Sequence, residues 1–218
     1  MKKSTWPLVI VAVFALVISV MAWNQYIFTP DALGENGDGL IGVKQGEATT
    51  FTALWTGMLY VHIVSSVIAL VIGAYQWFPR WRKKYRGAHR KLGMLYGIGV
   101  LFGGISGLYL AVYATGGWIS QAGFGVLAVL WLYTVFYGVR AGIQGNFREH
   151  RKWMLRNYAL TFAAVTLRMM ILISVSLFGG ENFLAYYVVI SWMCWVPNLL
   201  VAEWIIRRSD TVQHKLAT

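Results

Sequence analysis

The chain has 218 residues, of which 58% are hydrophobic and only 12% charged, and its formal net charge is +11. Soluble domains carry about 25% charged residues, so this composition excludes an ordinary soluble domain and indicates an integral membrane protein. The single cysteine, Cys194, excludes a disulfide framework and a Cys-rich zinc site. The sequence also contains no phosphate-binding loop, no dinucleotide fingerprint after a strand and no nucleophile elbow.

Six segments are apolar over roughly 20 residues, which is enough to cross the hydrocarbon of a bilayer. They cover residues 7–27, 53–77, 92–114, 118–139, 157–179 and 184–206. The sequence therefore predicts an all-α membrane protein with six transmembrane helices. We expect an N-terminal anchor at 1–28, an external loop at 29–52, a membrane core at 53–177, and a last helix with a cytoplasmic tail at 184–218.

The first segment also resembles a signal peptide, because Lys2 and Lys3 precede the apolar run and Val20-Met21-Ala22 resembles a cleavage site. An uncleaved anchor is favoured, since the apolar run continues to Ile27. The loop that follows is turn-rich and acidic but lacks the spacing of a calcium loop. We expect it to be a surface loop.

The positions of Lys and Arg predict the orientation, since these residues are retained on the cytoplasmic side. Of the 19 cations, 17 lie before the first span, in the second and fourth connections, or after the last span. We therefore expect both termini on the cytoplasmic side. The expected location is a bacterial inner membrane. The net charge is interpreted as this topological signal, with a basic face opposite anionic lipid headgroups, and not as a nucleic-acid-binding surface.

The second span carries an unusual polar face. His62, Ser66, Ala69, Gly73 and Gln76 recur at steps of four and three residues, which keeps them on one side of a helix. The remaining positions are aliphatic or aromatic. This pattern predicts that the face lines an internal site, although a buried histidine that only bonds a neighbouring helix would give the same pattern.

A short repeat organises the middle of the chain. "AHRKLG" enters the third span and "EHRKWM" enters the fifth, with His89 and His150 separated by 61 positions. Residues 53–114 and 118–179 therefore form two parallel helix hairpins, expected to make a four-helix core. In the third span, Gly93, Gly97, Val100, Gly104 and Gly107 form a stripe that permits close helix approach or admits a flat cofactor.

Arg168 lies within the fifth span, where a guanidinium costs about 2.5–3.5 kcal/mol at the centre of a helix unless it is paired or hydrated. Counted from the outer ends of their spans, Arg168 and His62 are expected at one depth, where the sequence supplies no acidic partner. A bound carboxylate or phosphate, or a hydrated cavity, would explain this arginine. Snorkelling toward the surface is the alternative.

The two repeated histidines have two open interpretations. They could contact lipid phosphates among the surrounding cations, or repeat symmetry could make them an axial pair on haem iron or a partial metal site with Gln76. On the haem hypothesis, His89 and His150 are the iron ligands and His62 is a further candidate. Arg90, Arg151 and Arg168 would hold propionates or headgroups, and Gly97 and Gly104 would accommodate the ring.

With His62, these two motifs resemble an uncharacterised bacterial family of multi-pass membrane proteins, a domain of unknown function, over about residues 55–205. The arrangement more distantly resembles the four-helix cores of cytochrome b561 proteins and haem A synthases, which bind b-type haem through histidines on paired hairpins. The chain departs from these haem proteins because Gly123 or Phe124 stands where His62 would recur. The resemblance therefore implies at most one bis-histidine site.

Three functions remain as hypotheses. The first is a membrane redox protein that binds haem b or a quinone for electron transfer, working with a membrane redox partner or as a homo-oligomer. The second is a small-molecule transporter with His62 and Arg168 at its substrate site. The third is a non-catalytic assembly subunit that packs against a partner. The sequence does not specify an enzymatic reaction.

Overall fold

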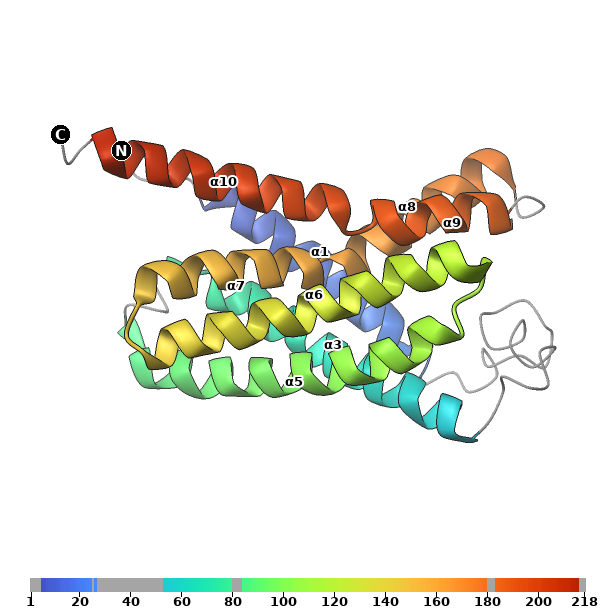
Figure 1. Ribbon diagram of the computed structural model, residues 1–218, viewed down its shortest axis with the longest axis horizontal. Helices are drawn as coiled ribbons and strands as arrows, with labels where there is room; N and C mark the ends of the chain where they lie inside the picture. Colours follow the sequence, from blue (N-terminus) through green and yellow to red (C-terminus); the bar gives the residue numbers. More distant parts are fainter. Residues whose placement is uncertain (1–4, 25, 27–52, 80–83, 180–182, 216–218) are drawn as a thin grey trace. The chain divides into compact units, whose positions relative to one another are not determined.

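The computed structural model describes residues 5–24, 26, 53–79, 84–179 and 183–215, and the elements in this part of the chain are all helices (Figure 1). Six helical segments among these residues are long and apolar enough to span a membrane. The predicted fold class is therefore confirmed. The predicted external loop at 29–52 lies outside the described residues. The helices are α1 Trp6–Trp23, α3 Ala53–Gln76, α5 Arg86–Val112, α6 Gly117–Ile143, α7 Phe147–Thr161, α8 Ala163–Phe178, α9 Phe183–Met193 and α10 Val196–Lys215.

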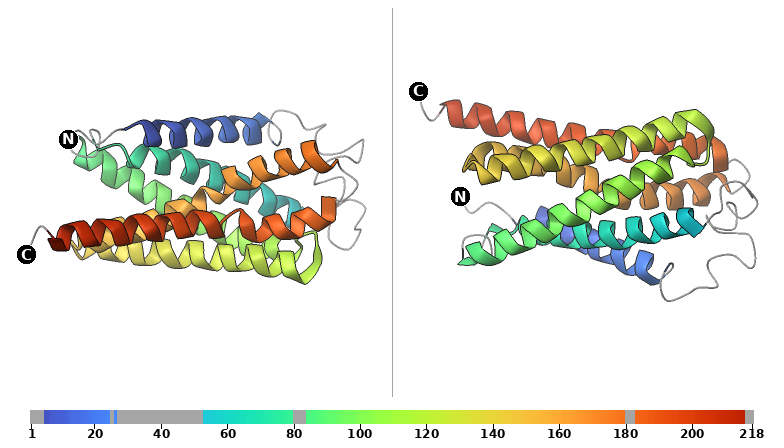
Figure 2. Two further views of the ribbon diagram at one scale, coloured as in Figure 1. Left: turned by 90° about the horizontal axis from the view of Figure 1, so that it is seen from above. Right: turned by 60° about the horizontal axis from the view of Figure 1, so that its bottom comes forward.

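The chain divides into two compact units, Met1–Ala114 and Thr115–Thr218, which are called the N-terminal and C-terminal units below. In the N-terminal unit, α3 and α5 form a hairpin and α1 packs along α3 (Figure 2). Trp55, Leu59 and Ile63 form a buried apolar cluster on α3, against which Tyr109 and Leu110 of α5 pack. The predicted four-helix core combines helices of both units and stays a prediction.

In the C-terminal unit, α6 and α7 form the second hairpin, α9 packs against α6 and α8, and α10 lies beside α7. The fifth span is interrupted at Phe162 and the sixth at Cys194 and Trp195. Pro197 accounts for the second interruption, since it has no N–H to donate to the Met193 carbonyl. At the first interruption the Thr161 hydroxyl bonds the Asn157 carbonyl, a contact that tends to bend helices.

Several helices extend beyond the apolar spans predicted from the sequence. Helix α5 begins at Arg86 instead of 92, α7 begins at Phe147 instead of 157, and α10 continues to Lys215 instead of ending at 206. These extensions carry ten of the 17 Lys and Arg residues assigned to the cytoplasmic side. The reason is physical: hydropathy detects only the hydrocarbon-facing part of a helix, whereas the backbone continues into the headgroup region. The Asn146 side chain caps α7 by accepting the Glu149 N–H at 3.2 Å.

Candidate membrane histidine site

The first repeated histidine joins the two helices of the N-terminal hairpin near their connection. His89 Nδ1 lies 2.7 Å from Gln76 Oε1, and Gln76 Nε2 donates to the His89 carbonyl at 2.9 Å. A Cβ added at Gly93 would lie 3.3 Å from Gln76 Nε2, so the glycine one turn farther along α5 leaves room for this amide. The structure thus brings together Gln76 and His89, two of the predicted site residues.

The second repeated histidine makes the equivalent link in the C-terminal hairpin, but to the backbone. His150 Nδ1 lies 2.7 Å from the Gly138 carbonyl of α6. A Cβ added at Gly142 would lie 2.9 Å from the same nitrogen, so the imidazole occupies space that only glycine leaves open. In both hairpins the histidine that opens the second helix therefore fastens it to the end of the first.

The third histidine lies deeper in the N-terminal hairpin. His62 is half-buried on α3, and its Nδ1 lies 2.8 Å from the Gly103 carbonyl of α5. The predicted polar face of the second span therefore turns toward α5. His62 and Gln76 are separated by 14 residues of one helix, or about 21 Å at 1.5 Å per residue. His62 and the Gln76–His89 pair consequently belong to two separate levels of the N-terminal unit.

These contacts define the tautomer of the neutral imidazoles. A carbonyl oxygen can only accept, so His62 and His150 must donate Nδ1–H, and the amide orientation of Gln76 gives His89 the same role. In a neutral imidazole of this tautomer the Nε2 atom carries the lone pair. A metal-ligating histidine commonly has this arrangement, in which the second ring nitrogen donates to an oxygen that orients the ring.

A close approach of α3 and α5 lies beside the predicted glycine stripe. A Cβ added at Gly99 would lie 2.9 Å from the Ser65 carbonyl oxygen and 3.5 Å from the Ala69 Cβ. Of the predicted ring-accommodating residues, Gly104 is buried and Gly97 is half-buried. Helix α5 meets α3 along a face that contains Gly99 and the Gly103 carbonyl.

The predicted anion-binding arginines differ in their surroundings. Arg90 and Arg151, which follow the two repeated histidines, are both exposed. Arg168 is half-buried on α8 and donates from Nη1 to the Ala164 carbonyl of its own helix at 3.1 Å. The shared depth of Arg168 and His62 involves both units and stays a prediction.

A buried polar network holds α6 against α7, and sequence analysis did not identify it as a unit. Asn157 Nδ2 donates to the Trp131 carbonyl at 2.7 Å and to Thr134 Oγ1 at 2.8 Å. Trp131 Nε1 in turn donates to Thr161 Oγ1 at 2.8 Å. Asn157 and Thr161 do recur on one face of the fifth span, but the sequence gives no sign that the indole of Trp131 completes the set.

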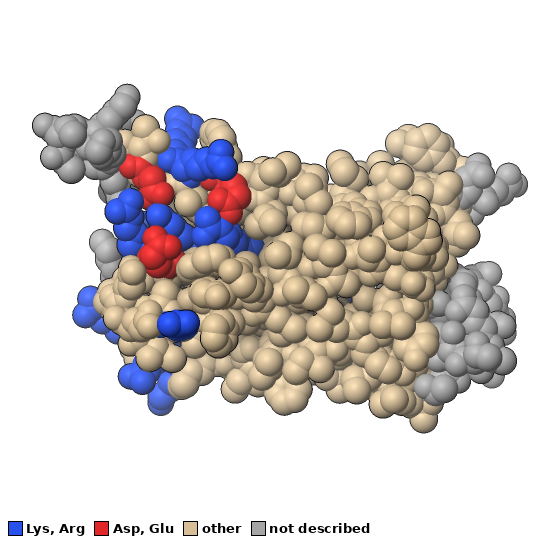
Figure 3. All heavy atoms as spheres, in the orientation of Figure 1, with Lys and Arg blue, Asp and Glu red and all other residues tan. Residues whose placement is uncertain are grey.

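A ladder of ion pairs, also not predicted, fastens α10 to the beginning of α7. Arg156 forms a two-pronged pair with Glu203, while Arg148 and Lys152 contact Asp210 at 2.8 and 2.9 Å. Figure 3 shows these charges gathered where α7 begins and α10 ends. Hydrogen bonds from Arg148 and Lys152 lower the pKa of the Asp210 carboxyl. The pairs give an antiparallel order, since the start of α7 meets the end of α10.

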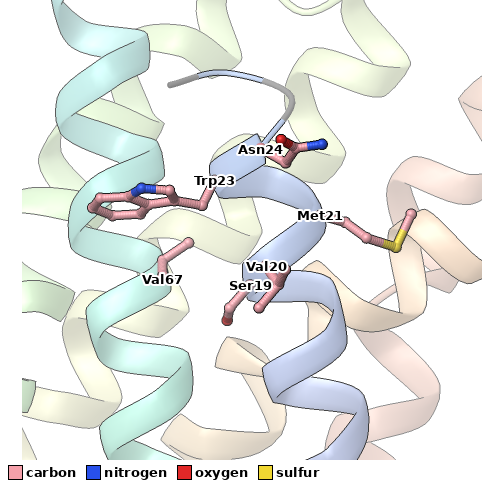
Figure 4. Close-up of a pocket in the computed structure, with 6 residues that line it drawn as sticks. All are labelled: Ser19, Val20, Met21, Trp23, Asn24 and Val67. Atoms are coloured by element: carbon pink, nitrogen blue, oxygen red, sulfur yellow. The ribbon is translucent and has the colours of Figure 1, made fainter. Parts of the chain in front are cut away.

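The N-terminal unit also contains a cavity of about 470 Å³ between α1 and α3, lined by Ser19, Val20, Met21, Trp23, Asn24 and Val67. In Figure 4 the Trp23 indole lies beside Val67, whereas Met21 points away. The lining is almost entirely apolar and includes none of the predicted site residues. Within the described part of the chain, no three His, Cys, Asp or Glu side chains gather closely enough to hold a metal ion.

Comparison with known proteins identifies the family but no activity. A family model described as "Predicted membrane protein (DUF2306)", a domain of unknown function, matches residues 59–206, and the chain therefore belongs to this family. No curated protein and no solved structure matches the chain. The predicted resemblance to an uncharacterised membrane family is thus confirmed, while the more distant likeness to cytochrome b561 proteins and haem A synthases is not shown.

Proposed function

We propose that this member of the family is a membrane electron-transfer protein that binds haem b or a quinone. One observation supports the proposal above others: His62, His89 and His150 each direct Nδ1 at an oxygen acceptor of the partner helix. A hydrogen bond of this kind orients the ring, as in histidines that ligate a metal through Nε2. Ionisable residues within membrane spans are costly and usually serve a function.

The donor chemistry fits haem better than a metal ion held only by protein. A b-type haem needs one or two axial imidazoles, because the porphyrin supplies the other four ligands. Its iron would supply one-electron chemistry within the membrane. The protein would contribute oriented imidazoles and cations for the propionates.

His89 and His150 are each proposed as an axial haem ligand, because they occupy equivalent positions of the two repeated motifs. Arg90 and Arg151, each one residue farther on, are the proposed propionate partners. Both guanidiniums are exposed and so could reach a carboxylate at the headgroup level. The proposal requires no acidic side chain.

The test is the reduced-minus-oxidised visible spectrum of the purified chain, produced in cells supplied with a haem precursor. His89→Asn and His150→Asn are the informative variants, because the Asn amide nitrogen lies near the position of His Nδ1. It can therefore keep the hairpin hydrogen bond while removing Nε2. His214→Asn is the matched control, since His214 follows the predicted spans.

A stoichiometric alpha band that each of the two variants abolishes, and the control does not, would support both histidines as haem ligands. A band lost in only one variant would support a single axial histidine. If the folded wild-type protein is colourless, the haem proposal is wrong. The transporter and assembly-subunit hypotheses would then be the ones to test. A solute-uptake assay and copurification of a stoichiometric partner would then separate those two.

A further inference from the structure

An exposed row of side chains runs along α6 and ends in a cation. Tyr133, Phe136 and Arg140 recur at steps of three and four residues, which keeps them on one side of the helix. Tyr133 is 47% exposed, Phe136 is 60% exposed, and Arg140 is exposed in the last turn of α6. The exposed side of this helix therefore carries aromatic rings and, one turn farther along, a guanidinium.

The rings belong to an ordered aromatic group between α6 and α7. Trp153 of α7 stacks on Tyr137 with ring centroids 5.2 Å apart, and its centroid lies 5.8 Å from that of Tyr133. On α7 itself, the Arg156 guanidinium lies 4.7 Å from the Trp153 centroid and is paired with Glu203. Because these contacts fix the rings relative to one another, the aromatic surface is formed before a ligand binds.

Arg140 differs from the cations of the ion-pair ladder, each of which is matched by a carboxylate. No described residue forms a hydrogen bond or an ion pair with Arg140. Its charge is therefore not balanced within the described part of the chain. A guanidinium presents planar N–H donors that match two oxygens of a phosphate group. The end of the row thus has the charge and the donors that a phosphate requires.

The spacing of the cation and the rings fits a phospholipid. Tyr133 precedes Arg140 by seven residues, or about 10 Å along a helix that is long enough to span the membrane. A soluble anion would contact the cation alone, whereas a phospholipid joins a phosphate to acyl chains that can lie along the rings. Charge then selects the headgroup. Phosphatidylglycerol is a net anion, but the ammonium of phosphatidylethanolamine cancels its phosphate.

We propose that this side of α6 is a binding site for one anionic phospholipid. The Arg140 guanidinium donates to the phosphate, and an acyl chain lies along Phe136 and Tyr133. This site is more specific than the general attraction of a basic surface to anionic headgroups, because it assigns one cation and one orientation to the lipid. It is also independent of the proposed redox function, since no histidine takes part.

The test is native mass spectrometry of the purified full chain in a non-ionic detergent, which resolves successive lipid-bound states and gives their dissociation constants. The probes are phosphatidylglycerol and phosphatidylethanolamine with identical palmitoyl and oleoyl chains. The wild type should bind its first phosphatidylglycerol more tightly than its first phosphatidylethanolamine. Arg140→Gln should weaken the first phosphatidylglycerol about fivefold, the contribution of one cation near the membrane surface, and leave phosphatidylethanolamine unchanged.

Arg86→Gln is the matched control, because it removes the same charge from an exposed position at the beginning of α5. The exposed residue one turn farther along α5 is Arg90 and not an aromatic ring. This variant should leave the first phosphatidylglycerol unchanged. Phe136→Ala should weaken both lipids by a common factor, since it removes a contact with the chain and none with the headgroup. Unchanged midpoints of thermal unfolding would show that all three variants fold.

Three results would overturn the inference. Equal losses of phosphatidylglycerol in Arg140→Gln and Arg86→Gln would show that net charge alone attracts the lipid. Equal affinity of the wild type for the two lipids would show that the cation does not select the headgroup. A dimer that persists without lipid, and that Phe136→Ala dissociates, would assign the aromatic surface to a second copy of the chain. The visible spectrum that tests for haem depends on none of these measurements.

Discussion

The two hairpins carry the same histidine motif but are held together by different forces. In the N-terminal hairpin, α3 and α5 approach so closely at Gly99 that even a methyl group would meet the Ser65 carbonyl. In the C-terminal hairpin, side chains of α7 fill the space beside Gly138 and Gly142, and a buried network around Asn157 joins the two helices. The repeat therefore preserves the position of the histidine while the means of helix association has changed.

This difference follows from what can drive helix association in lipid. The hydrophobic effect does not pull apolar helices together there, so close backbone packing and interhelical hydrogen bonds take its place. The N-terminal hairpin has a contact of the first kind at Gly99, and the C-terminal hairpin has a buried network of the second kind around Asn157. Each should consequently be sensitive to a different kind of substitution.

The largest effect is expected at Gly99. Gly99→Ala places a Cβ 2.9 Å from a backbone oxygen, which cannot rotate away, so α3 and α5 must separate. Overpacking of this kind costs about 1–3 kcal/mol. The measurement is the free energy of unfolding by SDS titration in mixed micelles. Gly57→Ala and Gly87→Ala are the controls, since neither Cβ would meet an atom within 4 Å. Equal losses in all three variants would contradict the steric explanation.

Asn157→Leu should affect the C-terminal hairpin next. The change keeps the branched shape of the side chain but leaves the Trp131 carbonyl and Thr134 hydroxyl without this donor. Interhelical hydrogen bonds in membranes contribute about 0.6 kcal/mol on average and up to about 1.7, so the loss should be smaller than at Gly99. The same titration measures it. Ser176→Ala is the control, because that exposed hydroxyl bonds only its own helix. If Asn157→Leu unfolds as the wild type does, the network is not what holds α6 to α7.

The histidine links provide a third contrast, because one acceptor is a side chain and the other is backbone. Gln76→Ala removes the acceptor of His89 and should cost about 1 kcal/mol. No side-chain deletion can remove the acceptor of His150, but Gly142→Ala should displace its imidazole. Backbone hydrogen exchange at the start of α5 and α7 measures both. Gln76→Ala should speed exchange only in α5, and Gly142→Ala only in α7. Exchange that rises in both helices with either variant would show that the links do not act separately.

The sequence predicted the parts of this molecule that depend on composition and local spacing. The six spans follow from hydropathy, and the face containing His62 and Gln76 follows from helical periodicity. It could not predict that Gly99, beside the expected stripe, makes the close contact, because a small rotation of a helix changes which residue meets its neighbour. Trp131 escaped prediction for a similar reason, since the sequence does not show which residue of the facing helix its indole meets.

The ion-pair ladder should give the smallest effect and a distinctive pH dependence. The pKa of Asp210 is lowered by Arg148 and Lys152, so the carboxylate stabilises the docked end of α10 above its unfolded pKa of about 3.9. This contribution is lost as the pH falls through the lower, folded value. Exposed pairs contribute little and are screened by salt. Hydrogen exchange over 207–215 at neutral pH should therefore rise slightly in Asp210→Asn and in high salt.

The control for this prediction is Arg208→Gln on the same helix, whose guanidinium lies over the Trp204 ring and forms no part of the ladder. That variant should leave the exchange rate and its salt dependence unchanged. Exchange in Asp210→Asn that stays at the wild-type rate, with the salt dependence intact, would mean that the Arg156–Glu203 pair is the part of the ladder that helps to dock α10. The Arg156–Glu203 pair lies nearer the membrane and is only partly exposed. The ladder would then stabilise the docked helix through this pair, and the contacts of Asp210 would contribute nothing measurable.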